Sequence, residues 1–202
     1  MYNFSIPMAL VDYIPVVFFG ITMVLLQRDL YNKMYKGAYA LFAAGTINVF
    51  MAGFLKATWK LLYAANICDF VALEEMFMPV NSIGLLLVGL SLIGMLCWKR
   101  KDAVMLSAAP AVFSGSLVFI LMMVIGLGGM CAVLSILAAR MKKKGAIVLF
   151  VLSFACAMGM GYMSSQDSSL AWVNWVEQSI NTVSQLCLML GVIVLHKAGL
   201  KD

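Results

Sequence analysis

Charge is the scarcest property of this sequence. Only 11% of its 202 residues are charged and one is a histidine, whereas 64% are apolar and the mean hydropathy is +1.00. A soluble globular domain carries about 25% charged residues, so that class is excluded. Several apolar runs approach or exceed the ~20 residues that one bilayer crossing requires. We therefore predict an all-α integral membrane protein, a single membrane domain of residues 1–202 in contact with the lipid bilayer.

Catalytic signatures are missing too. The sequence contains no HExxH, no GxSxG, no glycine-rich phosphate loop and no metal-spaced cluster. Its only histidine, His196, has no partner nearby in sequence, although nucleophilic or metal chemistry needs an oriented base. We therefore expect no catalytic residue, no metal site and no cofactor. A membrane hydrolase that uses only carboxylates from Glu74, Glu75 or Glu177 stays open, but no specific pattern supports it.

Close cysteine pairs and a basic N-terminal region are absent as well. The five cysteines contain no CxxC pair for a metal or redox site: Cys68, Cys97, Cys131, Cys156 and Cys187. Before its first apolar run the chain carries Asp12 and no Lys or Arg, the reverse of a secretory signal, so we expect the first helix to stay in the mature protein. The net charge of +5 comes from basic residues at helix ends, where orientation signals belong, so no nucleic-acid partner is predicted.

Long apolar runs are what the sequence does contain. Spans are expected at about residues 9–27, 38–63, 79–98, 146–163 and 170–196. Residues 103–139 suit either one span or two short ones with a turn near residues 126–129, GLGG. With two, every basic residue except Lys56 and Lys60 falls on one side, whereas one span divides them almost evenly. The positive-inside bias therefore favours seven helices in a cell membrane, with the N-terminus outside and the C-terminus in the cytoplasm.

Two parts of the chain resemble each other. At an offset of 108 residues, matching positions are Gly20, Lys36, Gly37 and Ala38 with Gly128, Lys144, Gly145 and Ala146. A shorter loop then aligns Ser82-Ile83 with Ser179-Ile180. We predict two parallel three-helix repeats, at about residues 9–98 and 127–196, joined by a linker helix at about residues 103–124. The alternative is a chance match in a biased composition. Parallel repeats place a pseudo-twofold axis along the membrane normal and a central site between the halves.

The last span is unusually polar in its first half. Asn174, Glu177, Asn181 and Ser184 follow helical spacing, and a second stripe runs beside them: Gln178, Thr182 and Gln185. A helix cannot point such side chains at lipid without a desolvation penalty, so they are expected to face a protein interior or a wet cavity. For Asn174 and Glu177 the alternative is a solvated cap above the membrane.

This arrangement resembles the three-plus-one-plus-three carriers, which include the SWEET and PQ-loop transporters and the nicotinamide-riboside-type vitamin transporters. The resemblance covers the whole chain as topology. The sequence Trp172-Val173-Asn174-Trp175 looks like the Trp-x-x-Trp signature of the nicotinamide riboside carriers, but it lies at the entrance to the last helix rather than deep in a span. There is no Pro-Gln dipeptide, and Pro15 lies where a SWEET-like first helix hinges. The resemblance implies passage of a small solute through the membrane.

Together these patterns predict facilitated passage of a small polar solute, because no ionisable residue is expected near the bilayer centre. The expected substrate-binding residues are Asn48, Asn81, Asn181, Ser184, Gln185, Trp172 and Trp175. Glu177 with Lys56 or Lys60 is expected to form an outer gate, unless these are plain surface charges. The alternative function is a non-transporting seven-helix sensor or assembly module that binds a ligand or partner at its outer face. Whether the chain acts as a homo-oligomer is left open.

Overall fold

The structure, a computed structural model, describes residues 5–97, 116–163 and 171–200. The described residues form helices joined by turns, namely α1 (Ile6–Val11), α2 (Tyr13–Leu30), α3 (Lys36–Ala64), α4 (Ala72–Glu75), α5 (Phe77–Cys97), α6 (Ser116–Arg140), α7 (Lys144–Met163) and α8 (Ala171–Lys197). Six segments are long and apolar enough to cross a membrane: α1 with α2, α3, α4 with α5, α6, α7 and α8. The expected all-α class is therefore confirmed for the described part of the chain.

Residues with left-handed backbone geometry end three of these helices. Asn66 (φ 54°) follows α3, Lys142 (φ 57°) lies between α6 and α7, and Gly199 (φ 89°) follows α8. After α8 the backbone N–H of Gly199 donates to the His196 carbonyl and that of Leu200 donates to the Leu195 carbonyl, which is the Schellman pattern of helix ends. This turn folds Leu200 back into the apolar core, where it is 2% exposed.

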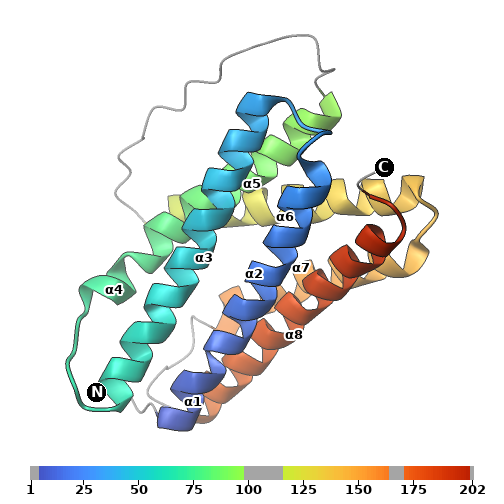
Figure 1. Ribbon diagram of the computed structural model, residues 1–202. Helices are drawn as coiled ribbons and strands as arrows, with labels where there is room; N and C mark the ends of the chain where they lie inside the picture. Colours follow the sequence, from blue (N-terminus) through green and yellow to red (C-terminus); the bar gives the residue numbers. More distant parts are fainter. Residues whose placement is uncertain (1–4, 98–115, 164–170, 201–202) are drawn as a thin grey trace.

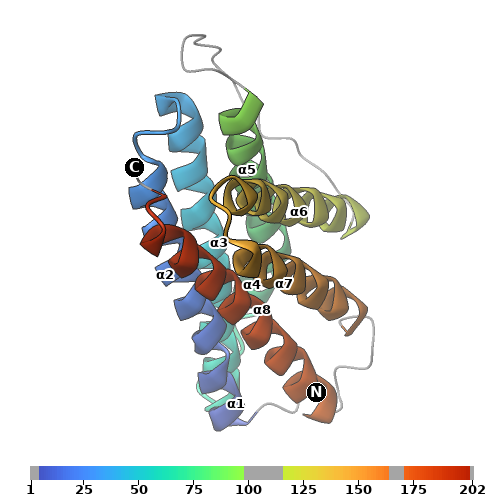
Figure 2. The same cartoon turned by 90° about the vertical axis from the view of Figure 1, so that its right-hand side faces the viewer.

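The six long helices form a closed ring. Each packs against two neighbours in the order α2, α3, α5, α6, α7, α8 and back to α2 (Figures 1 and 2). Four of the six contacts join antiparallel helices. For example, Gly45 of α3 packs on Gly84 of α5, and Phe150 of α7 packs on Gly191 of α8. The ring therefore has no helix at its centre within the described residues.

The other two contacts join parallel helices. Along α5 and α6, Leu85 lies against Gly126 and Ile93 lies against Gly129, so both helices run the same way. Along α2 and α8, the Asp29 side chain meets that of His196 near the ends of both helices. We call the end of the ring where α1 begins the N-terminal end, and the end where α8 finishes the C-terminal end. The first and last described helices thus begin and finish at opposite ends of the ring (Figure 1).

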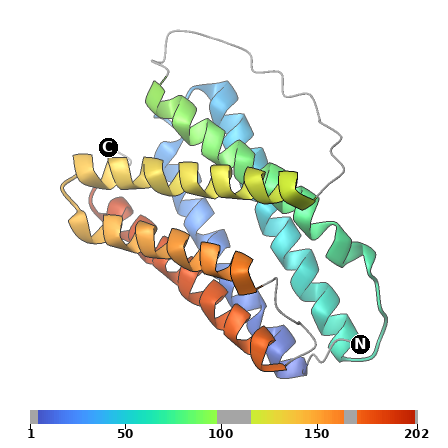
Figure 3. The same ribbon diagram turned by 180° about the vertical axis from the view of Figure 1, so that it is seen from behind.

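The prediction of a turn near residues 126–129 is wrong. These residues lie inside the continuous helix α6, which crosses α5 and runs on to its hairpin with α7 (Figure 3). A Cβ atom at Gly89 would lie 2.5 Å from the Gly126 carbonyl oxygen, and one at Gly126 would collide with the Leu85 backbone. The glycines therefore permit close approach of two helices instead of breaking one.

The predicted linker helix at residues 103–124 is affected by this correction. Its last residues, 116–124, belong to α6, and residues 103–115 lie outside the described ranges. The second repeat was expected to begin at about residue 127, which instead lies inside α6, a helix that begins at Ser116. The seventh helix stays a prediction, because the described residues contain six spans.

The apolar core occupies the half of the ring near the C-terminal end. Its fully buried members come from every long helix: Leu26, Leu30, Phe42, Leu92, Met130, Leu134, Phe150, Leu188 and Leu195. Leu200, which follows the last turn of α8, also belongs to this cluster. This half of the ring is therefore densely packed between the helices, and a pocket of about 300 Å³ lies beyond the core at the C-terminal end itself, lined among others by Leu96, Leu137 and Leu200.

We expect Gly126→Ala to destabilise the protein by about 1–3 kcal/mol, because its Cβ meets backbone atoms that cannot rotate away. The matched control is Gly159→Ala on α7, where an added Cβ meets nothing within 4 Å. Thermal unfolding of the purified proteins in one detergent measures the difference. Equal unfolding temperatures for the two variants would contradict the close packing of α5 on α6.

Candidate functional site

A central cavity of about 180 Å³ is lined by all six long helices. Its wall includes Pro15 and Phe19 of α2, Gly53 of α3, and Met123 of α6, which lie in the halves of their helices nearer the N-terminal end. Toward the C-terminal end the buried core follows directly, since Leu188 lines the cavity and also belongs to the core. The cavity therefore lies between the helices in the N-terminal half of the ring.

Four polar side chains line this cavity, one from α5 and three from α8: Asn81, Asn181, Ser184 and Gln185. The Ser184 hydroxyl donates to the Ser153 carbonyl of α7 at 2.8 Å, so its proton is already used. The Gln185 side-chain oxygen is buried without a hydrogen-bond partner in the described structure. An unpaired buried acceptor costs about 1–3 kcal/mol, and a ligand that donates a hydrogen bond to it would remove that cost.

Among the residues that the structure describes, the remaining wall of the cavity is apolar and carries no charged side chain. Aromatic rings and thioethers make up much of it: Phe19, Phe50, Phe77, Met123, Met158 and Met160. A charged ligand would lose its hydration there with no opposite charge among the lining residues, which costs far more than the same loss for a neutral ligand. The cavity therefore suits an uncharged molecule that has apolar faces and a few groups able to form hydrogen bonds with the side-chain amides of Asn81, Asn181 and Gln185.

The structure gathers some of the predicted site residues and separates others. Asn81, Asn181, Ser184 and Gln185 lie together on the cavity wall. Asn48 is half-buried on α3 and does not line the cavity. Trp172 and Trp175 are 61% and 41% exposed at the start of α8 and do not line it either. Helical spacing in α8 is the sequence pattern that correctly placed several residues, Asn181, Ser184 and Gln185, together on the cavity wall.

Buried charges gather near the N-terminal end of the ring. The Lys60 ammonium lies 2.6 Å from the Asp12 carboxylate, with side-chain exposures of 14% and 6%. The Lys56 ammonium lies 4.2 Å from the ring centroid of Phe77, and Glu177 lies within its electrostatic range. Phe77 also lines the central cavity, so Lys56 is one side chain away from it. Sequence reasoning paired these lysines with Glu177 or the loop acids and missed Asp12, which is distant in sequence.

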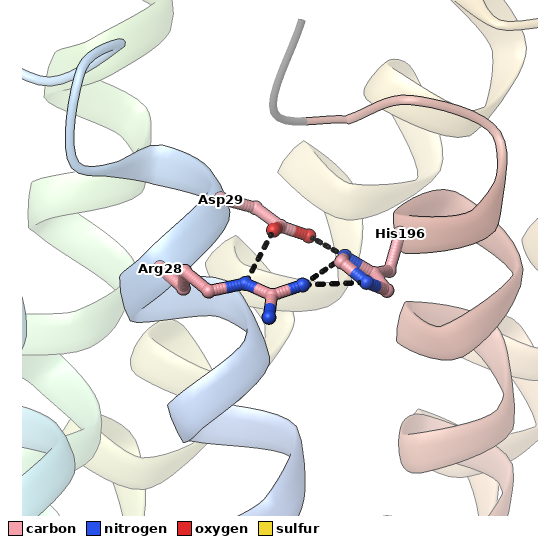
Figure 4. A network of polar contacts seen from close by, with 3 residues as sticks. All are labelled: Arg28, Asp29 and His196. Atoms are coloured by element: carbon pink, nitrogen blue, oxygen red, sulfur yellow. Dashed lines mark hydrogen bonds and ion pairs between the residues drawn. The ribbon is translucent and has the colours of Figure 1, made fainter.

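A second polar cluster lies near the C-terminal end of the ring (Figure 4). The Asp29 carboxylate is 2.7 Å from Nδ1 of His196, and Nη2 of Arg28 is 2.7 Å from Nε2 of His196. The Asp29 side chain is fully buried, whereas those of His196 and Arg28 are 24% and 61% exposed. We call these three residues the Asp29 cluster. It joins α2 to α8. Sequence spacing gave no sign of it, because Asp29 and His196 lie 167 residues apart.

The geometry of the Asp29 cluster fits a neutral histidine. With its proton on Nδ1, His196 donates to Asp29, and its bare Nε2 accepts from the Arg28 guanidinium. The acid and the guanidinium then balance in charge. If the ring were protonated on both nitrogens, its Nε2–H would face the Arg28 guanidinium, which is also a donor, and no hydrogen bond could form between them. The central acid of the cluster is thus shielded from water, and its Oδ1 has no hydrogen-bond partner in the described structure.

Comparisons of the chain with protein-family models, curated proteins and solved structures give no match. Function therefore has to be argued from the cavity and the two clusters themselves.

Breaking the Asp12–Lys60 pair should destabilise the protein. We expect Lys60→Met to cost about 3 kcal/mol or more, because it leaves the Asp12 carboxylate buried without its cation. The double variant Asp12→Asn with Lys60→Met loses the same lysine contacts but buries no charge, so it should recover much of that loss. Thermal unfolding in detergent measures both, and a double variant no more stable than Lys60→Met would contradict a buried ion pair.

Proposed function

We propose that this chain is a membrane carrier that passes a small uncharged solute through the central cavity, between a half made of α2, α3 and α5 and a half made of α6, α7 and α8. The observation that carries the proposal is a cavity lined by all six long helices, with amide side chains facing an otherwise apolar wall. Ligand sites commonly combine apolar walls with a few placed polar groups. A site shared by two halves is the arrangement in which relative movement can expose it to either side.

The composition of the cavity wall supports the internal repeat. At the offset of 108 residues, four lining positions of the first half correspond to four of the second: Pro15 with Met123, Phe19 with Leu127, Val49 with Ala157, and Phe50 with Met158. The repeat makes α2 correspond to α6, α3 to α7 and α5 to α8. The helices of each corresponding pair run in the same direction, because neighbours in the ring are antiparallel except at α2 with α8 and at α5 with α6. Two parallel repeats about a pseudo-twofold axis through the cavity account for both facts.

For the last helix of each half, the packing favours an offset of 100 residues over the 97 that aligned Ser82-Ile83 with Ser179-Ile180. At 100, Asn81 corresponds to Asn181 on the cavity wall, and Leu85 corresponds to Gln185. The close contact of Gly45 with Gly84 then corresponds to that of Ser153 with Ser184. The two asparagines become symmetry-related partners that can hold one solute from opposite halves.

The parallel course of α5 and α6 supports the seven-helix topology. Cys97 ends α5 near the C-terminal end of the ring, and Ser116 begins α6 nearer the N-terminal end, so the two positions lie on opposite sides. Such a chain has its termini on opposite sides of the membrane. With the positive-inside bias, the N-terminal end of the ring faces outward and the C-terminal end faces the cytoplasm. The topology is that of the three-plus-one-plus-three carriers.

Passage is proposed to be facilitated rather than ion-driven, because no charged residue of the described ranges lines the cavity. The packed core beneath the cavity corresponds to a form of the carrier that is closed toward the cytoplasm. The alternative function, a non-transporting sensor or assembly module, requires a dry bundle with a groove on its outer face. A polar cavity between the two halves favours the carrier.

Removing the cavity amides should slow transport. In proteoliposomes tested with a panel of radiolabelled uncharged solutes, we expect Asn181→Ala and Gln185→Ala each to lower uptake about tenfold, since each loses one buried hydrogen bond. Asn48→Ala is the matched control, because this asparagine lies outside the cavity wall. Parental uptake of a verified substrate by both cavity variants would show that the site is placed wrongly.

The termini should be found on opposite sides of the membrane. Epitope tags fused to the N-terminus and to the C-terminus can be probed with antibody before and after the cells are permeabilised. We expect the N-terminal tag to be stained on intact cells and the C-terminal tag only after permeabilisation. Staining of both tags under the same condition would rule out the seven-helix topology.

A further inference from the structure

We propose that the Asp29 cluster is an inner latch, which holds the two halves together at the cytoplasmic end and must separate before the cavity opens toward that side. The proposal rests on the carrier function proposed above. It assigns a role to His196, Arg28 and Asp29, which lie far from the cavity wall and bind no part of the solute.

The latch spans the boundary between the two halves. Arg28 and Asp29 lie in the last turn of α2, and His196 lies in the last turn of α8, one helix from each half. The halves meet mainly along two contacts, α2 with α8 and α5 with α6, and Gln178 of α8 also donates to the Val11 carbonyl of α1. The Asp29 cluster therefore lies on one of the two surfaces that must change when the halves move against each other.

The Asp29 cluster lies too far from the cavity to bind the solute there. Leu188 is the last residue of α8 on the cavity wall, and His196 lies eight residues further along the helix, about 12 Å at 1.5 Å per residue. Fully buried apolar side chains fill the space between the cavity and His196, including Leu26 and Val192. The cluster thus closes the cytoplasmic end of a packed plug and does not form part of the cavity.

The chemistry of the cluster suits a contact that opens and closes. The Asp29 carboxylate is fully buried, and one of its oxygens has no hydrogen-bond partner in the described structure. Burying an ion pair costs desolvation that its attraction only partly returns, so such pairs add little net stability. Separation of α8 from α2 would admit water, which solvates the acid, the guanidinium and the imidazole. The closed and open states are then close in free energy, as a gate requires.

The side from which a cavity cysteine is reached tests the latch without a known solute. Asn181→Cys is introduced, and a membrane-impermeant maleimide is added to right-side-out or inside-out vesicles. Mass spectrometry of the peptide that carries position 181 separates its modification from that of the native cysteines. With the latch intact, we expect modification from the outer side and protection from the cytoplasmic side.

Breaking the latch should reverse this protection. We expect His196→Ala and Asp29→Asn, each in the Asn181→Cys background, to raise modification from the cytoplasmic side about tenfold or more. Lys197→Ala is the matched control, because this exposed neighbour of His196 is outside the cluster, and it should leave modification unchanged. The exchanged pair Asp29→His with His196→Asp keeps an acid opposite an imidazole and should restore protection.

The outcomes decide between the latch and the carrier function separately. Parental modification in both broken variants, with monodisperse protein on size-exclusion chromatography, would overturn the latch. So would an exchanged pair that behaves as the broken variants do. If His196→Ala does not fold, Asp29→Asn carries the same test, because it removes the charge but keeps the shape. Latch-dependent modification in a chain that takes up no solute would overturn the carrier function and leave the latch supported.

Discussion

The close contact between α5 and α6 is the constraint on which the ring depends. Gly89 and Gly126 bring the two backbones together without side chains between them, and no other residue type fits at either position. In lipid, helices gain little from burying apolar surface against each other, so short-range packing of this kind supplies much of their attraction. Because the proposed halves divide between α5 and α6, this contact fixes where they meet. The position of the cavity beside it then follows from the side chains of the remaining helices.

The two boundaries between the halves differ in kind, although the proposed repeat makes them equivalent. At α5 and α6 the boundary is dry and built from backbone atoms in contact. Where α1 and α2 face α8 it carries polar groups at both ends, with Gln178 donating to the Val11 carbonyl of α1 at 3.3 Å near the N-terminal end and the Asp29 cluster near the other. Packed glycines resist separation because any gap forfeits their dispersion contacts, whereas polar groups can exchange partners for water. A rocking motion would therefore pivot on α5 and α6 and open along α2 and α8.

The sequence was informative about elements and about one helix face, and much less so about partners. Apolar runs located five of the six described spans but divided α6 in two, and helical spacing in α8 placed Asn181, Ser184 and Gln185 together on one wall. Glycine was misread at residues 126–129, because the same residue type marks turns and close helix contacts, and only the neighbouring helix decides between them. Asp12 with Lys60, and Asp29 with His196, could not be paired in advance, since nothing local records which distant helix lies alongside.

The position of charge in the molecule argues for movement rather than for static stability. Asp12 with Lys60 and the Asp29 cluster lie at opposite ends of the ring, and the cavity between them carries no charge. Apolar residues of similar size would hold either end more firmly, since buried ion pairs are often replaced by such residues without loss of stability. A protein that only had to stay folded in lipid would gain nothing from buried acids at both ends. The proposed carrier would gain at the C-terminal end of the ring, because the contact that closes it there also becomes well hydrated once it opens.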